Sequence, residues 1–165
     1  MVKIEYAKRE DFSFYYSTKC EKDNIYWSGY DNEPDLEHMK QIFNQWIEEM
    51  SELNARKVLI IYYNGVKAGY LYLSPLDNGD IEISIGVSEK FSGHGIGAKA
   101  CVEAIKFMKN EGKHSLIAYI REDNHRSIHV FEKSGFVEDK NNAVCKCVEN
   151  TTKELKMLKF KYILC

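Results

Sequence analysis

The sequence has no hydrophobic run long enough to cross a membrane and no cluster of positive charge. No apolar stretch approaches the length of about 18 residues that a transmembrane helix needs, and the N-terminus lacks the apolar core of a signal peptide. Lys and Arg number 23 against 25 Asp and Glu, which gives a net charge of −2. Neither a nucleic acid nor a membrane surface is therefore favoured as a partner, and we expect a cytoplasmic protein.

Proline is scarce, and the cysteines show no pattern. Only 2 of the 165 residues are proline, and no linker rich in Gly or Ser divides the chain, so the sequence predicts one domain over residues 1–165. The 5 cysteines are scattered and odd in number, which argues against a disulfide framework. Cys145 and Cys147 have the spacing of one strand face, and no second Cys or His pair stands at zinc-ligand spacing. We therefore expect no bound metal.

A β-hairpin is the clearest element that the sequence does contain. Residues 57–63 (KVLIIYY) and 66–73 (VKAGYLYL) are rich in β-branched and aromatic side chains, which is typical of strands. Asn64-Gly65 between them suits the type I′ turn of a two-residue hairpin loop. The pattern predicts two adjacent antiparallel strands.

The next strand, residues 81–87, alternates strictly between apolar and other residues. Its isoleucines and Val87 face one side of the sheet, whereas Glu82, Ser84 and Gly86 face the other. This pattern predicts a strand with one face in the core and one more polar face.

Helical periodicity predicts several helices around these strands. One helix begins after an N-cap at Asp35, another spans 95–111 before Gly112, and a third spans 124–134 before Gly135. The order of elements predicts a three-layer mixed α/β fold with a parallel crossover through helix 95–111. The helix after Asp35 carries an apolar stripe of Leu36, Met39, Phe43, Trp46, Ile47 and Met50. The other expected elements are strand 2–7, helix 11–20 and strands 114–121, 136–148 and 156–164; segment 23–32 is rich in aromatic residues and turn formers.

The junction between strand 81–87 and helix 95–111 is rich in glycine. Gly93, Gly95 and Gly97 permit positive φ and leave no Cβ in the way of a ligand. The first N–H groups of a helix lack intrahelical acceptors, and the macrodipole adds partial positive charge there. The sequence therefore predicts either an anion site or a plain tight turn. The whole loop consists of Ser92, Gly93, His94, Gly95, Ile96 and Gly97.

Two common phosphate-binding motifs do not fit this loop, but a family pattern does. A P-loop requires Ser or Thr after its Lys, which Lys99 lacks, and the G-x-G-x-G spacing differs from the dinucleotide fingerprint. Residues 124–136 (NHRSIHVFEKSGF) form a second motif. The loop and this motif together resemble the GNAT N-acetyltransferase superfamily. The matching residues of the second motif are Asn124, Ser127, Ile128, Phe131, Lys133, Gly135 and Phe136.

The resemblance implies a fold and an activity. The fold is a GNAT-like α/β domain whose mostly antiparallel sheet contains a splayed parallel pair and has helices on both faces. The activity is transfer of the acetyl group of acetyl-CoA to a primary amine, such as a protein N-terminus, an amino sugar or another small amine. The loop backbone would bind the CoA pyrophosphate, and strand 81–87 would bind the pantetheine amides. The cofactor-binding residues that the resemblance implies are Ile85, Gly86, Val87, Ser92, Gly93, His94, Gly95, Ile96, Gly97, Asn124, Ser127 and Phe131.

Two positions depart from the family pattern. Ser92 stands where the family has Arg or Gln, so a side-chain contact to phosphate is lost or is replaced by His94 or Lys99. Phe131 stands where the family frequently has a tyrosine that protonates the leaving thiolate, and a phenyl ring has no such proton. Asn124 has two interpretations that can coexist, a contact to pantetheine and an N-cap of its own helix.

Glu82 is the expected general base. An amine with a pKa near 10.4 is neutral in only roughly one of 2500 molecules at pH 7, so a group that accepts its proton assists the reaction. Glu82 lies on the polar face of strand 81–87, and the resemblance places a frequent glutamate at this position. The acceptor is open: residues 27–30 (WSGY) line its site or belong to the core, and the charge balance weakly favours a cationic amine.

Two functions of other classes stay open on the sequence alone. One is a non-catalytic acyl-CoA-binding or sensor domain, which Ser92 and Phe131 suit. The other is a nucleotide-binding module that uses the same loop for a different phosphate. Dimers are common in the family, and no feature of the sequence decides between a monomer and a homodimer.

Overall fold

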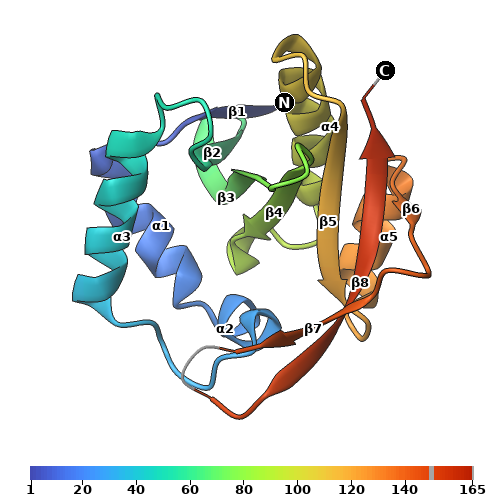
Figure 1. The fold of residues 1–165 in the computed structure, drawn as a ribbon. Coiled ribbons are helices and arrows are strands. Elements are labelled where there is room, and N and C mark those ends of the chain that lie inside the picture. Colours follow the sequence, from blue (N-terminus) through green and yellow to red (C-terminus); the bar gives the residue numbers. More distant parts are fainter. Residues whose placement is uncertain (149–150, 165) are drawn as a thin grey trace.

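A mixed β-sheet with helices on both faces forms the molecule (Figure 1). The computed structural model describes residues 1–148 and 151–164. In the described chain the sheet has 8 strands in the order β1-β2-β3-β4-β5-β8-β6, and β7 also pairs with β8. The strands are β1 Val2–Tyr6, β2 Lys57–Tyr63, β3 Val66–Pro75, β4 Ile81–Val87, β5 Ser115–Arg121, β6 Val137–Glu138, β7 Val144–Cys147 and β8 Glu154–Ile163.

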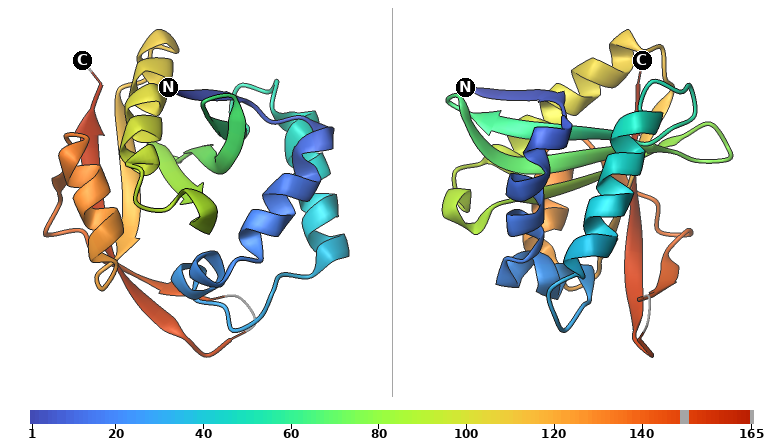
Figure 2. Two further views of the ribbon diagram at one scale, coloured as in Figure 1. Left: turned by 180° about the vertical axis from the view of Figure 1, so that it is seen from behind. Right: turned by 90° about the vertical axis from the view of Figure 1, so that its left-hand side faces the viewer.

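The helices form the two outer layers. One face of the sheet is covered by α1 and α3, and the opposite face by α4 and α5 (Figures 1 and 2). The helices are α1 Phe12–Lys19, α2 Lys22–Ser28, α3 Leu36–Glu49, α4 Ile96–Asn110 and α5 His125–Lys133, with short 3-10 helices at Arg9–Asp11 and Glu89–Phe91. The predicted three-layer α/β fold is confirmed.

Each face of the sheet has its own hydrophobic core. The α4 side buries the apolar face of β4, including Ile81 and Ile83, against residues of α4 such as Cys101. The other side is more aromatic, because Tyr15 of α1, Phe43 of α3 and Tyr70 of β3 pack together there. The alternation predicted for β4 is therefore confirmed, and its polar face lies on the aromatic side.

The predicted hairpin is confirmed, including its turn. Asn64 has φ 50° and Gly65 has φ 81°, so both central residues have the positive φ that a type I′ turn requires. The hairpin pairs β2 with β3, and β3 then pairs with β4 from Gly69–Val87 to Pro75–Ile81. This continuous antiparallel pairing fixes which side chains of β3 and β4 are neighbours.

Three details differ from the sequence-based expectation. Segment 23–32, to which no element was assigned, contains most of α2, a helix with no buried residue and therefore no apolar period to detect. The expected strand 136–148 is two short strands, β6 and β7, which pair with successive parts of β8. Leu36 of the expected apolar stripe is 46% exposed, because it lies in the first turn of α3, beyond the edge of the aromatic core.

Candidate active site

The two parallel strands in the middle of the sheet separate along their length. Within the described residues, β4 pairs with β5 at Ile81–Leu116 and Glu82–Ile117 only. Both strands then continue, and Figure 1 shows them diverging toward their C-terminal ends. Backbone groups of β4 beyond Glu82 consequently face an opening in the sheet.

The direction of the β4 backbone groups follows from one hydrogen bond. The Ser88 N–H donates to the Ala68 carbonyl oxygen of the β3 side at 2.9 Å. Successive residues of a strand direct their N–H and C=O groups to opposite neighbours, so Ile85 and Val87 direct theirs toward β5. Both belong to strand 81–87, which the family resemblance assigned to pantetheine binding, and the structure places their amide groups at the opening.

The glycine loop lies at the wide end of this opening and begins α4. Gly93 has φ 80° and Gly95 has φ 68°, and a Cβ on Gly95 would have no atom within 4 Å. In the part of the chain that the structure describes, the N–H groups of residues 93–98 have no acceptor; the first bond of the helix is Lys99 N–H to Gly95 O at 3.3 Å. These free donors and the α4 macrodipole suit a pyrophosphate, so the residues present fit the CoA that the resemblance implies.

An arginine that the sequence analysis did not consider stands beside this loop. The Arg126 Nη1 atom donates to the Ser92 hydroxyl at 3.0 Å, and its Nη2 lies 3.2 Å from the Asp23 carboxylate. The His94 ring instead turns back, with Nδ1 3.0 Å from the Ser92 carbonyl oxygen. A guanidinium therefore lies beside the position where the family has Arg or Gln. Its position in the second motif, two residues after Asn124, is a signal that could have identified it.

Some residues of the second motif lie at the start of α5, and others lie in the hydrophobic core. The Asn124 side chain accepts a hydrogen bond from the Ser127 N–H at 3.1 Å, so the N-cap interpretation of Asn124 is confirmed. Phe131 is only 4% exposed and packs edge-on against Phe136 at 5.0 Å between ring centroids. The structure therefore places Phe131 in the core of the α4 side.

The polar face of β4 carries the expected base. Glu82 is half-buried and directly opposite Ser74 of β3, and Ser84 is opposite Tyr72. Ser84 is exposed although it lies on a central strand, so no helix covers this part of the sheet. We call this region, formed by Arg56, Tyr72, Ser74, Glu82 and Ser84, the Ser84 face.

Two buried tyrosines, Tyr15 and Tyr70, pack against Tyr72 of the Ser84 face. The hydroxyls of Tyr15 and Tyr72 are hydrogen-bonded, and the Tyr70 hydroxyl donates to Asn24 Oδ1 at 3.2 Å. Burial raises the pKa of Tyr15 to about 12 and raises the pKa values of Tyr70 and Tyr72 well above their ordinary range. All three phenols stay protonated at neutral pH, so none of them can serve as a base. Tyr70 also lies so close over Gly86 that a Cβ there would be 2.3 Å from its Cζ.

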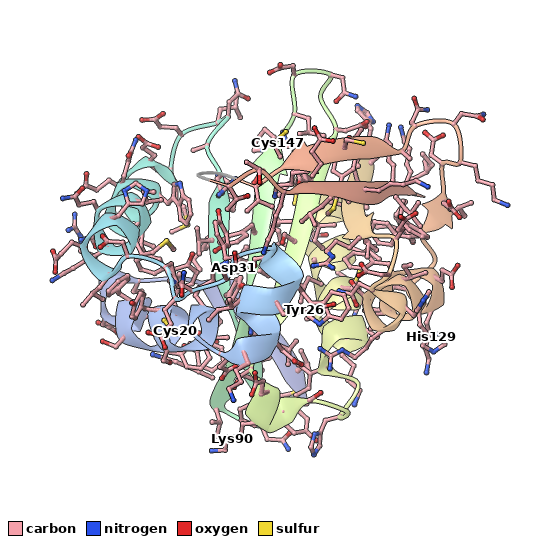
Figure 3. All side chains as sticks on the ribbon, turned by 90° about the horizontal axis from the view of Figure 1, so that it is seen from below. Cys20, Tyr26, Asp31, Lys90, His129 and Cys147 are labelled. Atoms are coloured by element: carbon pink, nitrogen blue, oxygen red, sulfur yellow. The ribbon has the colours of Figure 1, made fainter. Side chains whose placement is uncertain are left out.

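Helix α2 connects the segment just before the glycine loop to the end of β5 on the other side of the opening. At its N-terminus, Glu21 accepts hydrogen bonds from the Ser88 hydroxyl at 2.6 Å and from the Glu89 N–H at 2.8 Å. Near its C-terminus, Arg121 of β5 donates to the Tyr26 carbonyl oxygen at 2.8 Å. Figure 3 shows α2 in front of the sheet, between the loop that carries Lys90 and the strand that carries Cys147.

Other features of the described chain do not add to the site. Two surface cavities of about 380 and 370 Å³ lie elsewhere, one at the β1 edge and one beside α4. No group of three or more His, Cys, Asp and Glu side chains in residues 1–148 and 151–164 is placed to hold a metal ion. In these same residues, no helix has the length and apolar character needed to span a bilayer.

Known proteins resemble this chain in sequence and in fold. YwnH of Bacillus subtilis (strain 168), named a putative phosphinothricin acetyltransferase, is 39% identical over 67 residues, and the match spans 41% of each chain. The spermidine N-acetyltransferase of Vibrio cholerae, solved with CoA and spermine, has a TM-score of 0.82 at 11% identity and covers 99% of this chain and 95% of its own. The protein yncA of Salmonella typhimurium, named a putative acetyltransferase, was solved with acetyl-CoA. It has a TM-score of 0.73 at 21% identity and covers 99% of this chain and 94% of its own.

The sequence pattern of the acetyltransferase (GNAT) family matches residues 5–136. This span contains the β4–β5 opening, the glycine loop and the second motif. The chain therefore belongs to the acetyltransferase (GNAT) family.

Proposed function

We propose that this protein transfers the acetyl group of acetyl-CoA to a small primary amine by direct attack of the amine on the thioester. The observation that carries the proposal is the β4–β5 opening, where unpaired amide groups of β4 lead to the free N–H groups of the glycine loop. A chain of backbone donors along one edge suits an extended ligand with amides and a pyrophosphate.

Backbone groups bind most of the cofactor in this proposal. The N–H groups of residues 93–98 hold the pyrophosphate, with Arg126 adding a guanidinium at the rim. Ile85 and Val87 hold the pantetheine amides as a neighbouring strand would. Asn124 has a free Nδ2 within the described residues because its cap uses Oδ1, so the amide can bind pantetheine while the cap is kept.

Acetyl-CoA, when bound, supplies a thioester carbon that the amine nitrogen attacks, and CoA departs as its thiolate. The Val87 N–H faces the opening and is placed to stabilise negative charge on the carbonyl oxygen. Glu82 accepts the proton that the amine loses, directly or through one water molecule. Phe131 has no proton to give to the thiolate, so either another group of the protein or water supplies that proton.

The amine approaches from the Ser84 face. This face is open to solvent at Ser84 and lies on the same side of β4 as Glu82. The amine and acetyl-CoA therefore reach the reacting position from different sides of the sheet.

The experiment that tests this function is release of CoA thiol from acetyl-CoA over a panel of amines, for wild type and Glu82→Gln. We expect Glu82→Gln to lower kcat about 100-fold and to leave the Kd of CoA unchanged. Glu103→Gln, in an ion pair with Lys106 on α4, is the matched control and should keep the wild-type rate. A full rate for Glu82→Gln between about pH 6 and pH 9 would exclude Glu82 as the base.

A further inference from the structure

One cationic group of the Ser84 face and one at its border form no ion pair within the described residues. Arg56 precedes β2, and Lys19 ends α1. Among the described residues, neither side chain forms an ion pair, whereas Lys67 and Arg121 do. An unpaired arginine on the same face as the expected base is a feature that the overall charge of −2 does not reveal.

Arg56 is held in place by contacts that leave its outer donors free. Its Nε donates to the Ser74 hydroxyl at 2.9 Å, and its Cζ lies 4.7 Å from the centroid of the Trp46 ring and 5.2 Å from that of Tyr72. No hydrogen bond is found for Nη1 or Nη2 within residues 1–148 and 151–164. The guanidinium is thus oriented by two rings and one hydroxyl, with two donors unused.

The position of Arg56 relative to Glu82 follows from the strand register. Ser74, which binds Arg56, is directly opposite Glu82, and the Cβ atoms of such a pair are about 5 Å apart. Arg56 and Glu82 therefore lie on the same face, on either side of Ser74. A ligand that carries both an ammonium and an anionic group can reach Glu82 and Arg56 at once.

Lys19 adds a second positive charge to the same region. Its Nζ lies 5.4 Å from the centroid of the Tyr70 ring. Arg121 is paired with Asp123 through Nε and Nη2, and the Glu21 carboxylate, which also acts on Tyr70, accepts hydrogen bonds from the Ser88 hydroxyl and the Glu89 N–H. Arg56 is therefore the cation with free donors on this face, and Lys19 adds its charge at the border.

We propose that the amine acceptor carries an anionic group, as an amino acid does, and that Arg56 binds this group while the amine faces Glu82. This inference rests on the proposed function and names its substrate class. A planar guanidinium with two free donors binds a carboxylate in a bidentate manner. A polycation would instead meet two positive charges.

The experiment compares acceptors that differ only in this charge. Methionine, glutamate and β-alanine are each assayed beside their carboxamides, with spermidine as a polycation, by thiol release from acetyl-CoA. The carboxylate stabilises the ammonium form of its own amine, so intrinsic reactivity favours the amides. We nevertheless expect at least one acid to exceed its amide about 10-fold or more in kcat/KM. A kcat/KM for an amide or for spermidine that equals or exceeds the kcat/KM of the acids would overturn the inference and leave the proposed function intact.

Variants of Arg56 test whether this residue binds the anionic group of the acceptor. We expect Arg56→Gln to raise the KM of the preferred acid about 10- to 100-fold and to change the KM of the matching amide by less than about 2-fold. Arg56→Lys should give an intermediate KM for the acid. Arg9→Gln, on the surface in an ion pair with Glu48, should match wild type. An equal increase in KM for the acid and for its amide in Arg56→Gln would contradict a specific contact to the anion.

A thermal shift separates failure of the inference from failure of the proposed function. If no amine releases thiol, the proposed function is contradicted. The CoA-bound protein is then heated with each acid and each amide, because a ligand that binds the native state raises the melting temperature. A larger shift with the acid supports the anion site, and an equal or larger shift with the amide overturns it.

Discussion

The glycine loop and the Ser84 face are built on different principles. The loop is continuous in sequence, and its binding groups are backbone N–H groups of residues 93–98. The Ser84 face is assembled from side chains of β3, β4 and the segment before β2, and it is bordered by α1. The loop suits a ligand that is the same throughout the family, whereas the face can vary with the acceptor.

This difference explains why the two regions are expected to respond differently to substitution. Backbone donors disappear only when the backbone moves, so the loop depends on residues that permit its conformation. In a site made of side chains, a single substitution removes one contact and leaves the others in place. The substitutions below test this comparison, from the largest expected effect to the smallest.

Replacing Gly95 should damage the loop most. Gly95 has φ 68°, and a β-branched residue there forces the loop out of its conformation. We expect Gly95→Val to weaken CoA binding about 30-fold or more, which corresponds to about 2 kcal/mol, as measured by isothermal titration. Gly79→Val is the control, because Gly79 has a similar φ of 85° in a remote turn; a similar loss of CoA affinity in both would contradict a local effect.

Gly86→Ala should disturb the packing of Tyr70 on the aromatic side of β4 and so destabilise the fold. Its Cβ would be 2.3 Å from the Tyr70 Cζ, and Tyr70 is fixed between other rings, so we expect a loss of about 2 kcal/mol in the free energy of unfolding by urea denaturation. In a Tyr70→Leu background the cost should fall, since the ring is absent. An unchanged cost in that background would show that the overlap with Tyr70 is not the cause.

Arg126→Gln should have a smaller effect on CoA than Gly95→Val. Its guanidinium is exposed and shared with Asp23, so we expect about a 10-fold increase in the Kd of CoA, and a weaker dependence of that Kd on salt. Ser92→Ala should change the Kd by no more than about 2-fold. A loss in Ser92→Ala as large as in Gly95→Val would contradict binding by the backbone.

Replacing Asp80 should have the smallest effect. Asp80 lies just before β4, at the end of the opening where β4 and β5 are still paired. It accepts a hydrogen bond from Ser115 of β5 and lies 3.6 Å from Lys161 of β8. Burial raises the pKa of Asp80, but the Ser115 bond, Lys161 and Asn78 outweigh burial, and the pKa is lowered overall. A lowered pKa in the folded state stabilises the fold above the unfolded pKa, near 3.9, and this stability is lost as the pH falls through the folded value.

We therefore expect Asp80→Asn to lower the free energy of unfolding by about 1 kcal/mol at neutral pH. The difference from wild type should shrink below about pH 4, as measured by thermal unfolding across pH. CoA affinity should stay unchanged, because Asp80 is at the opposite end of β4 from the loop. A difference that persists at low pH would show that the charge of Asp80 is not involved.

The sequence by itself determined the local parts of this protein. Alternation predicted the two faces of β4, Asn64-Gly65 predicted the type I′ turn, and the glycines predicted the loop before α4. Each of these features depends on residues that are neighbours in the chain, whose conformational preferences appear directly as sequence patterns. Helix α2 escaped prediction because it buries no residue and so leaves no such pattern.

Only the tertiary structure decided which distant side chains meet. Arg126 meets Ser92 across 34 positions, and Arg56 meets Ser74 across 18, beside Glu82. These contacts depend on where α5 begins beside α4 and on how β2 and β3 pair, which no single segment encodes. Hydrophobic packing of whole elements sets those positions, so the guanidinium beside the loop and the unpaired arginine of the Ser84 face became visible only in the folded chain.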